Sequence, residues 1–482
     1  MRDRYVADHT QRGAGDAPGP KWEGCELPER SFSAESPLLL NPRAHLLRTN
    51  SGALLRDPAT GDWRLLSQSQ ALALALCGGK HCLSDMIPAM AELYGVPCEP
   101  VAAELTDLLS DCLRRGIVVV LPAPIDEPLY DHREFVFVPD PSPDAIHPNK
   151  LSTVGLQLSA GCALSCIYCF ASSKDGRGGF MPTPLALRLL DEGRQIGARF
   201  LLLGGGEPVS HPDISRILWR AVQLGYEDMQ VSTKATCITR DLAIRLRQAG
   251  LDRIQVSLDS WHPDEVDFLA GRKGAFQDIL SGLMHLLEQD FMVGIRPTLT
   301  RFNASSLPQL VRTLVPFGIR AFRPATMLAV GRGIRDLMPT AEQLADLERE
   351  LQAVREETGV DVTLGASRAG VLSHCIGART NIYVLAGGEV VPCDTIATLA
   401  GEAETFGNAL TQTLPEIWEG ERIRAFRRPR VKHPTCLACD MLLLCAGGCR
   451  VRALIFSGDM SEPDPRCCKI HPEHEVGAII PV

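Results

Sequence analysis

The pattern of apolar and polar positions divides the chain into blocks that predict different kinds of element. Residues 1–36 mix glycine, proline and charge without periodicity, which predicts a disordered tail. Residues 37–121 contain short strand patterns followed by three helical patterns. Residues 122–150 hold seven prolines and are expected to form a semi-extended linker. From residue 151 onward, apolar strand-like runs alternate with amphipathic helical patterns.

The block 37–121 is expected to open with strands and continue with helices. Asn50-Ser51-Gly52 and Thr60-Gly61-Asp62 supply the turn residues typical between adjacent strands. Ser84 is expected to cap the second of three helices, and Gly116 to end the third. The expected elements are strands Leu46–Thr49 and Ala53–Arg56, helices Gln70–Cys77, Ser84–Tyr94 and Val101–Arg115, and a closing strand Ile117–Leu121.

Six strand patterns alternate with helical patterns in the central part of the chain. They lie at Val154–Ser159, Phe200–Gly204, Met229–Thr233, Arg253–Leu258, Val293–Thr300 and Ala321–Ala325. Six such βα units predict an α/β fold, a partial (β/α)6 TIM-like barrel with a parallel sheet. The carboxyl ends of these strands are the expected place for a functional site.

Composition narrows the classes of function. A chain of 482 residues, 45% of them hydrophobic, has room for several domains with real cores. Its net charge of −9 argues against nucleic acid as a partner. No apolar run reaches membrane-spanning length and the N-terminus lacks a signal-peptide pattern, so a cytoplasmic protein is expected. Seventeen cysteines in such a chain indicate metal binding more than disulfides.

Cys162, Cys166 and Cys169 directly follow the first barrel strand, with the spacing C-x3-C-x2-C. Their loop therefore lies at a strand's carboxyl end. Three thiolates hold three irons of a [4Fe–4S] cluster, which leaves the fourth iron open to a small molecule. Zinc ligands or structural thiols remain the alternative, although zinc sites usually show four ligands in paired C-x2-C units.

This spacing, with Tyr168 before the last cysteine, resembles the signature of the radical S-adenosylmethionine (SAM) enzymes. The second barrel strand ends in a segment that resembles the GGEP element of that family, which lies along the methionine end of SAM: Gly204, Gly205, Gly206, Glu207 and Pro208. Glycine lets the backbone approach a ligand closely. The resemblance implies that SAM binds the open iron and is cleaved to a 5′-deoxyadenosyl radical that abstracts hydrogen from a C–H bond.

The same resemblance implies further SAM contacts at the ends of two other strands, from Ser232, Thr233, Ser257 and Asp259. Polar residues at strand ends are also ordinary where no ligand binds. The family often has an arginine for the SAM carboxylate where this chain has Ala270. Arg272, or another cation, would have to supply that contact. The pattern singles out no catalytic acid or base.

The C-terminal block, residues 366–482, carries the densest cysteine spacing. It resembles the seven-cysteine SPASM domain, which holds two auxiliary [4Fe–4S] clusters in enzymes that modify peptides and proteins. The resemblance assigns three cysteines to the first auxiliary cluster, namely Cys375, Cys393 and Cys449, and four to the second, namely Cys436, Cys439, Cys445 and Cys467. The implied cofactors are therefore SAM and three [4Fe–4S] clusters.

Several assignments in this block stay open. Cys468 competes with Cys467 as the last ligand. The fourth iron of the first auxiliary cluster is either held by Cys468, His374 or a distant side chain, or open to a substrate thiolate, since thiolates are preferred ligands of such clusters. The spacing also permits a zinc ribbon, with one ion held by Cys436, Cys439, Cys445 and Cys449.

Residues 37–121 resemble the PqqD-like winged-helix fold, with Leu65-Leu66-Ser67 before the first helix and Gly78-Gly79 after it. In that family a leader peptide adds a strand to the edge of the sheet. A generic winged helix, or a domain kept only for stability, matches the pattern as well. The expected domains are a tail 1–36, a PqqD-like domain 37–121, a linker 122–150, a radical SAM barrel 151–365 and a SPASM domain 366–482.

Together, the resemblances imply a radical SAM maturase that forms a thioether, C–C or C–O crosslink in a ribosomally synthesised peptide. The leader of the precursor would dock on the N-terminal domain, and a reductant such as flavodoxin or ferredoxin would supply electrons. Neither nucleic acid nor a membrane is expected as a partner. The rivals are a radical SAM/SPASM enzyme acting on a folded protein or small molecule, and a non-enzymatic iron–sulfur or zinc protein for electron transfer or binding.

Overall fold

The computed structural model describes residues 33–49, 52–58, 63–94, 97–125, 151–173, 179–360, 362, 364, 375, 377–428, 430–439, 442–467 and 470. The chain divides into two compact units, Met1–Pro148 and Asn149–Val482, each with its own apolar core. Most of the expected tail 1–36 and linker 122–150 lies outside the described residues. No helix among the residues described is long and apolar enough to cross a membrane.

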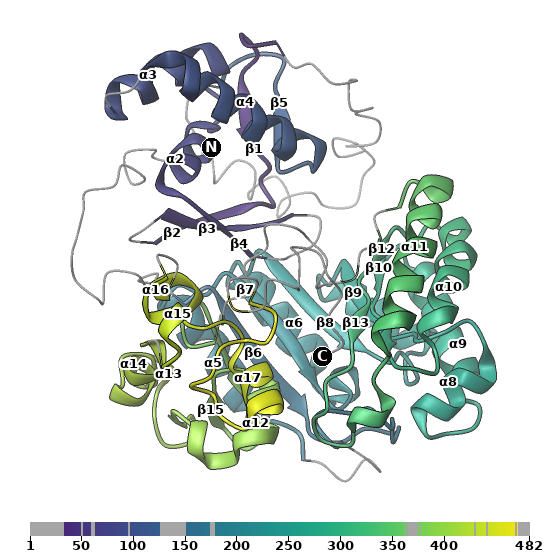
Figure 1. Cartoon of the computed structure of the whole chain (residues 1–482). Coiled ribbons are helices and arrows are strands. Elements are labelled where there is room, and N and C mark those ends of the chain that lie inside the picture. Colours follow the sequence, from purple (N-terminus) through teal and green to yellow (C-terminus); the bar gives the residue numbers. More distant parts are fainter. Residues whose placement is uncertain are drawn as a thin grey trace. The chain divides into compact units, whose positions relative to one another are not determined.

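The first unit combines a small sheet with three helices (Figure 1). The antiparallel sheet has the order β2 (His45–Thr49), β3 (Gly52–Arg56) and β4 (Trp63–Leu66). The helices are α2 (Gln68–Leu76), α3 (Leu83–Tyr94) and α4 (Cys98–Arg114), and β1 (Leu38–Leu40) pairs antiparallel with β5 (Val118–Val120). The predicted strands and the three helices are confirmed, whereas β1 was not predicted and β4 was implied only by the turn residues before it.

The beginnings of two helices show how local sequence fixes their ends. Ser67 caps α2 through a reciprocal pair of hydrogen bonds with Gln70, a capping box. The prediction that Ser84 caps α3 is wrong, because the helix already begins at Leu83. The carboxylate of Asp85, in the first turn, accepts a hydrogen bond from the backbone N–H of Cys82 at 3.1 Å. Asp85 therefore reaches back from the third position of the helix to the residue before it, as the acidic residue of a capping box does.

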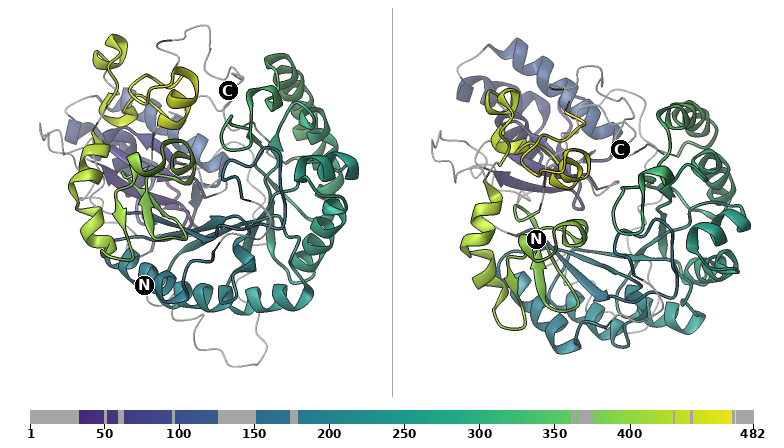
Figure 2. Two further views of the ribbon diagram at one scale, coloured as in Figure 1. Left: turned by 90° about the horizontal axis from the view of Figure 1, so that it is seen from below. Right: turned by 60° about the horizontal axis from the view of Figure 1, so that its bottom comes forward.

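The second unit is built on a parallel sheet whose strands follow one another in sequence order. They are β6 (Thr153–Ser159), β7 (Phe200–Gly205), β8 (Asp228–Thr233), β9 (Arg253–Val256), β10 (Met292–Ile295) and β12 (Ala321–Phe322). The helices around the sheet are α5 (Thr183–Gln195), α6 (Ile214–Gln223), α7 (Arg240–Gln248), α8 (Pro263–Ala270), α9 (Ala275–Leu287), α10 (Leu307–Leu314) and α11 (Ala341–Thr358) (Figure 2). The predicted partial barrel of six parallel strands is confirmed.

Two predicted strands are interrupted by proline. Val293–Thr300 contains β10 and a separate β11 (Thr298–Leu299), with Pro297 between them, and Ala321–Ala325 contains β12 and the start of β13 (Ala325–Thr326), with Pro324 between them. Proline has no backbone N–H to donate to the sheet. Beyond these prolines, β11 and β13 pair with each other and form a short parallel sheet of their own.

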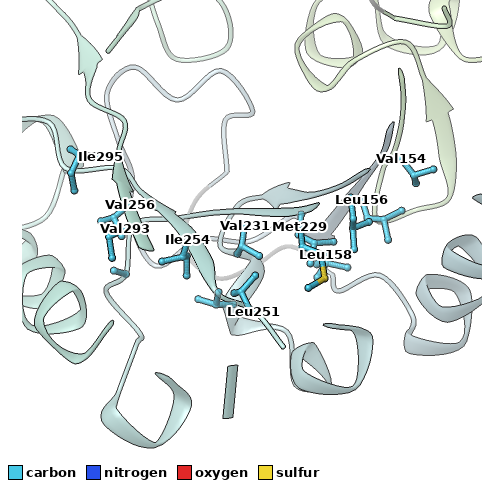
Figure 3. Packing of buried hydrophobic residues seen from close by; sticks show 14 of the residues in the cluster. Val154, Leu156, Leu158, Met229, Val231, Leu251, Ile254, Val256, Val293 and Ile295 are labelled. Atoms are coloured by element: carbon cyan, nitrogen blue, oxygen red, sulfur yellow. The ribbon is translucent and has the colours of Figure 1, made fainter. Parts of the chain in front are cut away.

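Alternate residues of the barrel strands form the core between the sheet and its helices (Figure 3). Val154, Leu156 and Leu158 of β6 are fully buried, and β8, β9 and β10 contribute apolar side chains in the same alternation. The positions between them are polar or small. For example, Gln230 donates to Gln255 across β8 and β9 at 3.0 Å.

Three more strands extend the barrel sheet beyond β6. They are β14 (Asn381–Val384), which pairs parallel with β6, and the antiparallel β15 (Glu389–Val391) and β16 (Gly407–Asn408). β14 and β15 are joined by the turn at Gly387-Gly388. Short helices complete this region: α12 (Asp394–Ala400), α13 (Leu414–Trp418), α14 (Glu421–Arg427), α15 (Pro434–Leu437), α16 (Leu442–Cys445) and α17 (Arg450–Ser457).

Candidate functional site

The loop after β6 brings Cys162, Cys166 and Cys169 together. They pack with Leu164 and two alanines in one small apolar cluster, and the backbone turns so that Cys169 N–H donates to the Cys166 carbonyl at 3.1 Å. Burial, with smaller contributions from Glu207 and the other two sulfurs, raises the pKa of the Cys162 thiol to about 11. Buried thiols of this kind ionise only when a cation compensates their charge, so the set fits an iron cluster that binds three thiolates.

Among the described residues, no three His, Cys, Asp or Glu side chains converge as ligands of a single metal ion. The cysteines of a [4Fe–4S] cube each hold a different iron, so they do not need to meet at one point.

The cysteine loop is held from outside by two backbone segments. Ser165 and Ile167 donate backbone hydrogen bonds to the segment that ends α8. On the other side, Arg332 donates from its backbone to the Cys169 carbonyl at 3.0 Å and from Nε to the Cys166 carbonyl at 2.8 Å. Both terminal nitrogens of this guanidinium are buried without a hydrogen-bond partner among the described residues. Arg332 is therefore a cation beside the loop with donors left for an anionic group.

The glycine segment after β7 lies directly against the start of the cysteine loop. Gly206 N–H donates to the Ser159 carbonyl at 2.6 Å, and Glu207 N–H donates to the Gly161 carbonyl at 3.0 Å. Gly205 has φ +116°, a conformation that side chains disfavour, and a Cβ at Gly206 would overlap the Gly161 carbonyl. The two loops therefore touch through backbone alone, which requires glycine.

A Gly206→Ala variant is expected to push these two loops apart, because the added methyl group has no space. We expect a loss of about 1–3 kcal/mol in the free energy of unfolding and weaker SAM binding, measured by chemical denaturation and equilibrium dialysis. Gly179→Ala is the matched control, since a Cβ there meets nothing within 4 Å. Equal behaviour of the two variants would contradict the close fit of the loops.

Glu207 is turned inward and is 3% exposed. Its carboxylate accepts hydrogen bonds from the Thr233 hydroxyl at 2.6 Å and from the Lys234 backbone N–H at 3.0 Å. Burial raises its pKa to about 7, although these two donors and the Lys234 charge oppose the rise. The end of β7 is therefore tied to the end of β8, and Thr233 acts in the site by holding Glu207. Pro208, next in the chain, begins a short 3-10 turn, Pro208–Ser210, in which Pro208 and Val209 are buried.

Lys234 is a site residue that the sequence reasoning missed. Its ammonium group donates to Asp259 at 2.5 Å and to the Tyr168 hydroxyl at 2.7 Å, and the Tyr168 hydroxyl also donates to Asp259. Asp259 is fully buried, and its second carboxylate oxygen accepts from Thr298 N–H at 2.9 Å. Although burial favours the neutral amine, Asp259 and the sulfurs of Cys166 and Cys162 raise the pKa of Lys234. A positive charge thus sits beside the cysteine loop.

Three of the other residues expected to contact SAM lie at or just after the carboxyl ends of barrel strands. Ser232 is half-buried near the end of β8, and Ser257 follows β9, where its N–H donates to the Thr233 carbonyl at 2.9 Å. Gly204 lies near the end of β7. Arg272 is partly exposed and pairs with Asp278 at 2.5 Å. The structure therefore ties its guanidinium to a surface carboxylate, and its contact with SAM stays a prediction.

The C-terminal cysteines gather in two groups. Cys375, Cys393 and Cys449 all pack against the main core of the second unit, and the other two sulfurs raise the pKa of Cys393, in addition to the larger effect of burial. The second group is formed by Cys436, Cys439, Cys445 and Cys467. There, burial raises the pKa of Cys436 and of Cys445, and neighbouring sulfurs of the group add to the rise. Cys468 and His374, the open alternatives as ligands, lie outside the described residues.

Buried arginines surround the first of these groups. Arg450 and Arg379 are nearly inaccessible to solvent. Burial lowers the pKa of Arg450 to about 10, which leaves it charged at neutral pH. Arg452 pairs with the buried Asp464, and the same carboxylate accepts a hydrogen bond from Cys449 N–H at 2.9 Å. Anionic sulfur groups would fit a site with such positive surroundings.

Comparison with known proteins places the two cysteine regions in families. Residues 156–314 match the Radical SAM superfamily, and residues 375–440 match SPASM, an iron-sulfur cluster-binding domain. The AdoMet-dependent heme synthase of Methanosarcina barkeri is 29% identical over 351 residues, which cover 66% of this chain and 97% of that protein. The PqqA peptide cyclase of Methylocella silvestris is 28% identical over 343 residues, covering 68% and 91%.

Among solved structures, Streptococcus suis SuiB bound to precursor peptide SuiA has a similar fold. Its TM-score is 0.60 at 17% identity, over 89% of this chain and 98% of that one. A match over 89% of the chain is longer than the second unit, so it extends into the first. The chain therefore contains a radical SAM domain, matched over residues 156–314, and after it an iron–sulfur cluster-binding SPASM domain, matched over residues 375–440.

Proposed function

We propose that this enzyme modifies a ribosomally synthesised precursor peptide by forming a thioether, C–C or C–O crosslink. The observation that carries the proposal is the combination of a radical SAM barrel, a SPASM domain and a small sheet-and-helix unit in one chain. The PqqA peptide cyclases, and SuiB in complex with SuiA, are proteins of similar sequence or fold whose names tie them to peptides.

The SAM site in this proposal consists of residues that the structure gathers around the cysteine loop. Cys162, Cys166 and Cys169 hold the cluster, and the glycine segment and Glu207 position SAM beside it. The bound cluster and SAM would supply the radical that abstracts hydrogen from the peptide. The protein's own part is to orient SAM: Lys234, Asp259 and Tyr168 fix the loop with a buried ion pair, and Arg332 offers two unused donors.

The SPASM region is proposed to hold two auxiliary [4Fe–4S] clusters, which gives three with the SAM-binding cluster. The separation of the cysteines into two groups supports this assignment. In particular, Cys449 lies with Cys375 and Cys393, which speaks against a zinc ribbon built from it and Cys436. A one-electron donor such as flavodoxin or ferredoxin would reduce the clusters in the cytoplasm.

The first unit is proposed to bind the leader of the precursor. Its three-stranded sheet ends in two edge strands, β2 and β4, and an extended peptide can add to such an edge through backbone hydrogen bonds. Holding the leader there raises the local concentration of the reacting segment near the barrel.

A second candidate is chemistry on a small molecule. It is favoured by the 29% identity to an AdoMet-dependent heme synthase. The first unit argues for the peptide, because a small substrate has no need of an edge strand.

The test is incubation of the anaerobically reconstituted full chain with SAM, dithionite and the peptide encoded beside its gene. We expect 5′-deoxyadenosine and a peptide lighter by two hydrogen atoms, detected by mass spectrometry. Omission of SAM is the control. Release of 5′-deoxyadenosine with an unchanged peptide, together with conversion of a heme precursor, would favour the second candidate instead.

A further inference from the structure

Arg450 follows Cys449 directly and begins α17, and its guanidinium group is enclosed by protein. The residue is 3% exposed and lies over the Phe426 ring, 4.0 Å from its centroid. One terminal nitrogen donates to the Arg428 carbonyl at 2.9 Å. Its Nε and Nη1 are buried without any hydrogen-bond partner among the described residues. An enclosed cation with two unused donors is costly unless an anion meets it.

The charged neighbours of Arg450 indicate where that anion belongs. The strongest attractive charge acting on it is the sulfur of Cys375, whereas Arg430 and Arg379 repel it. The nearby carboxylate of Glu404 is hydrogen-bonded to Arg430 at 2.7 Å. No described carboxylate pairs with Arg450, so the group of Cys375, Cys393 and Cys449 is the anionic site next to it.

We propose that Arg450 is the counter-charge of the first auxiliary cluster and raises its reduction potential. The inference rests on the proposed function, because it requires that Cys375, Cys393 and Cys449 hold a cluster. A cube bound by thiolates is anionic and gains another negative charge on reduction. Hydrogen bonds to the sulfurs and a nearby positive charge stabilise the reduced state more than the oxidised state. Nε–H and Nη1–H of Arg450 are the donors left for this purpose.

The test compares Arg450→Met with Arg450→Lys in the full chain reconstituted with iron and sulfide. Methionine keeps an unbranched side chain against Phe426 but removes the charge and the donors, whereas lysine keeps the charge. Redox titration followed by electron paramagnetic resonance measures the potential of each cluster. The comparison is made at the potential at which the wild-type cluster is half reduced. There, we expect Arg450→Met to lower the ratio of reduced to oxidised cluster about tenfold, and Arg450→Lys to lower this ratio much less.

Arg427→Met is the matched control. Arg427 is also a largely buried arginine, lies over the Trp418 ring at 4.2 Å and donates to backbone carbonyls, but no cysteine is among the groups that shift its pKa. Its replacement removes similar packing and should leave every cluster potential unchanged. If Arg427→Met shifts this potential as much as Arg450→Met does, the effect comes from packing and the inference is wrong.

A Cys393→Ala variant separates this inference from the proposed function. If Cys393→Ala loses iron and one electron paramagnetic resonance signal, that signal belongs to the first auxiliary cluster. Unchanged iron and unchanged signals would overturn the cluster assignment itself.

If the signal of this cluster is present and Arg450→Met leaves its reduction potential unchanged, the inference fails while the proposed function stands. If Arg450→Met fails to assemble this cluster and Arg450→Lys assembles it, the charge is required and the inference holds. Loss of the cluster in both variants would contradict it.

Discussion

Replacing Cys166 by alanine is expected to abolish SAM cleavage and to remove one cluster. Iron should fall from about twelve to about eight atoms per chain, because each cube contains four. With two thiolates left, the cube loses a ligand. Of the polar side chains beside Cys166, Lys234 is a cation, and Tyr168 and Asp259 are already engaged in hydrogen bonds with Lys234. Anaerobic reconstitution followed by iron analysis and chromatography of 5′-deoxyadenosine measures both effects.

Cys98→Ala is the control for this experiment, since Cys98 is an exposed thiol of the first unit. It should keep both the iron and the SAM cleavage of the wild type. A Cys166→Ala protein that retains both would show that the cysteine loop does not hold the cluster, and the proposed SAM site would have to be abandoned.

Replacing Asp259 by alanine is expected to lower the free energy of unfolding by about 3–5 kcal/mol. The change leaves the ammonium group of Lys234 enclosed without its carboxylate, since Lys234 is 10% exposed and Asp259 is fully buried. It also removes the acceptor for the Tyr168 hydroxyl and for Thr298 N–H. Urea denaturation of the full chain without iron, followed by circular dichroism, measures the loss in the second unit.

Two further variants make this result specific. Asp278→Ala breaks the partly exposed pair with Arg272 and should cost at most about 1 kcal/mol. The double variant Lys234→Met/Asp259→Leu removes both charges and should recover much of the stability lost in Asp259→Ala, but not SAM binding. Equal losses in Asp259→Ala and Asp278→Ala would mean that the buried ion pair contributes little.

The barrel strands were predictable because their signal is local. Each strand is a short apolar run that ends in glycine or a polar residue, as at Gly204 and Thr233, and each helix shows its own periodicity. These patterns depend only on neighbouring residues, so the order of the six βα units could be predicted without any contact information. The proline breaks at Pro297 and Pro324 are equally local and would have given the exact strand ends.

Pairing between distant segments could not be predicted in this way. The pairing of β1 with β5, and the addition of β14 to β6, depend on which edges are free in the folded sheet. No periodicity in Asn381–Val384 carries that information. Gly387-Gly388 is typical of a turn between two strands, but such a pattern does not give the place of these strands in the barrel sheet.

The candidate site likewise contains residues with a local sequence signal and residues that come together only through distant contacts. The cysteines and the glycine segment were predicted from spacing, because one backbone turn sets their geometry. Lys234 was missed, since a lone lysine after a strand is normally exposed. Its partners Tyr168 and Asp259 are separated by 91 residues in sequence. The position of Lys234 could have indicated its role. It directly follows Ser232 and Thr233 at the carboxyl end of a barrel strand, where functional residues lie.

The parallel pairing of β6 with β14 also bears on how the protein is synthesised. Until the ribosome has made residues 381–384, the strand that leads into the cysteine loop has no neighbour on one side. An open edge of this kind invites pairing with other chains. Nascent chains are therefore most exposed to aggregation between the completion of the barrel helices and the arrival of β14, and truncation before residue 381 would make that vulnerable state permanent.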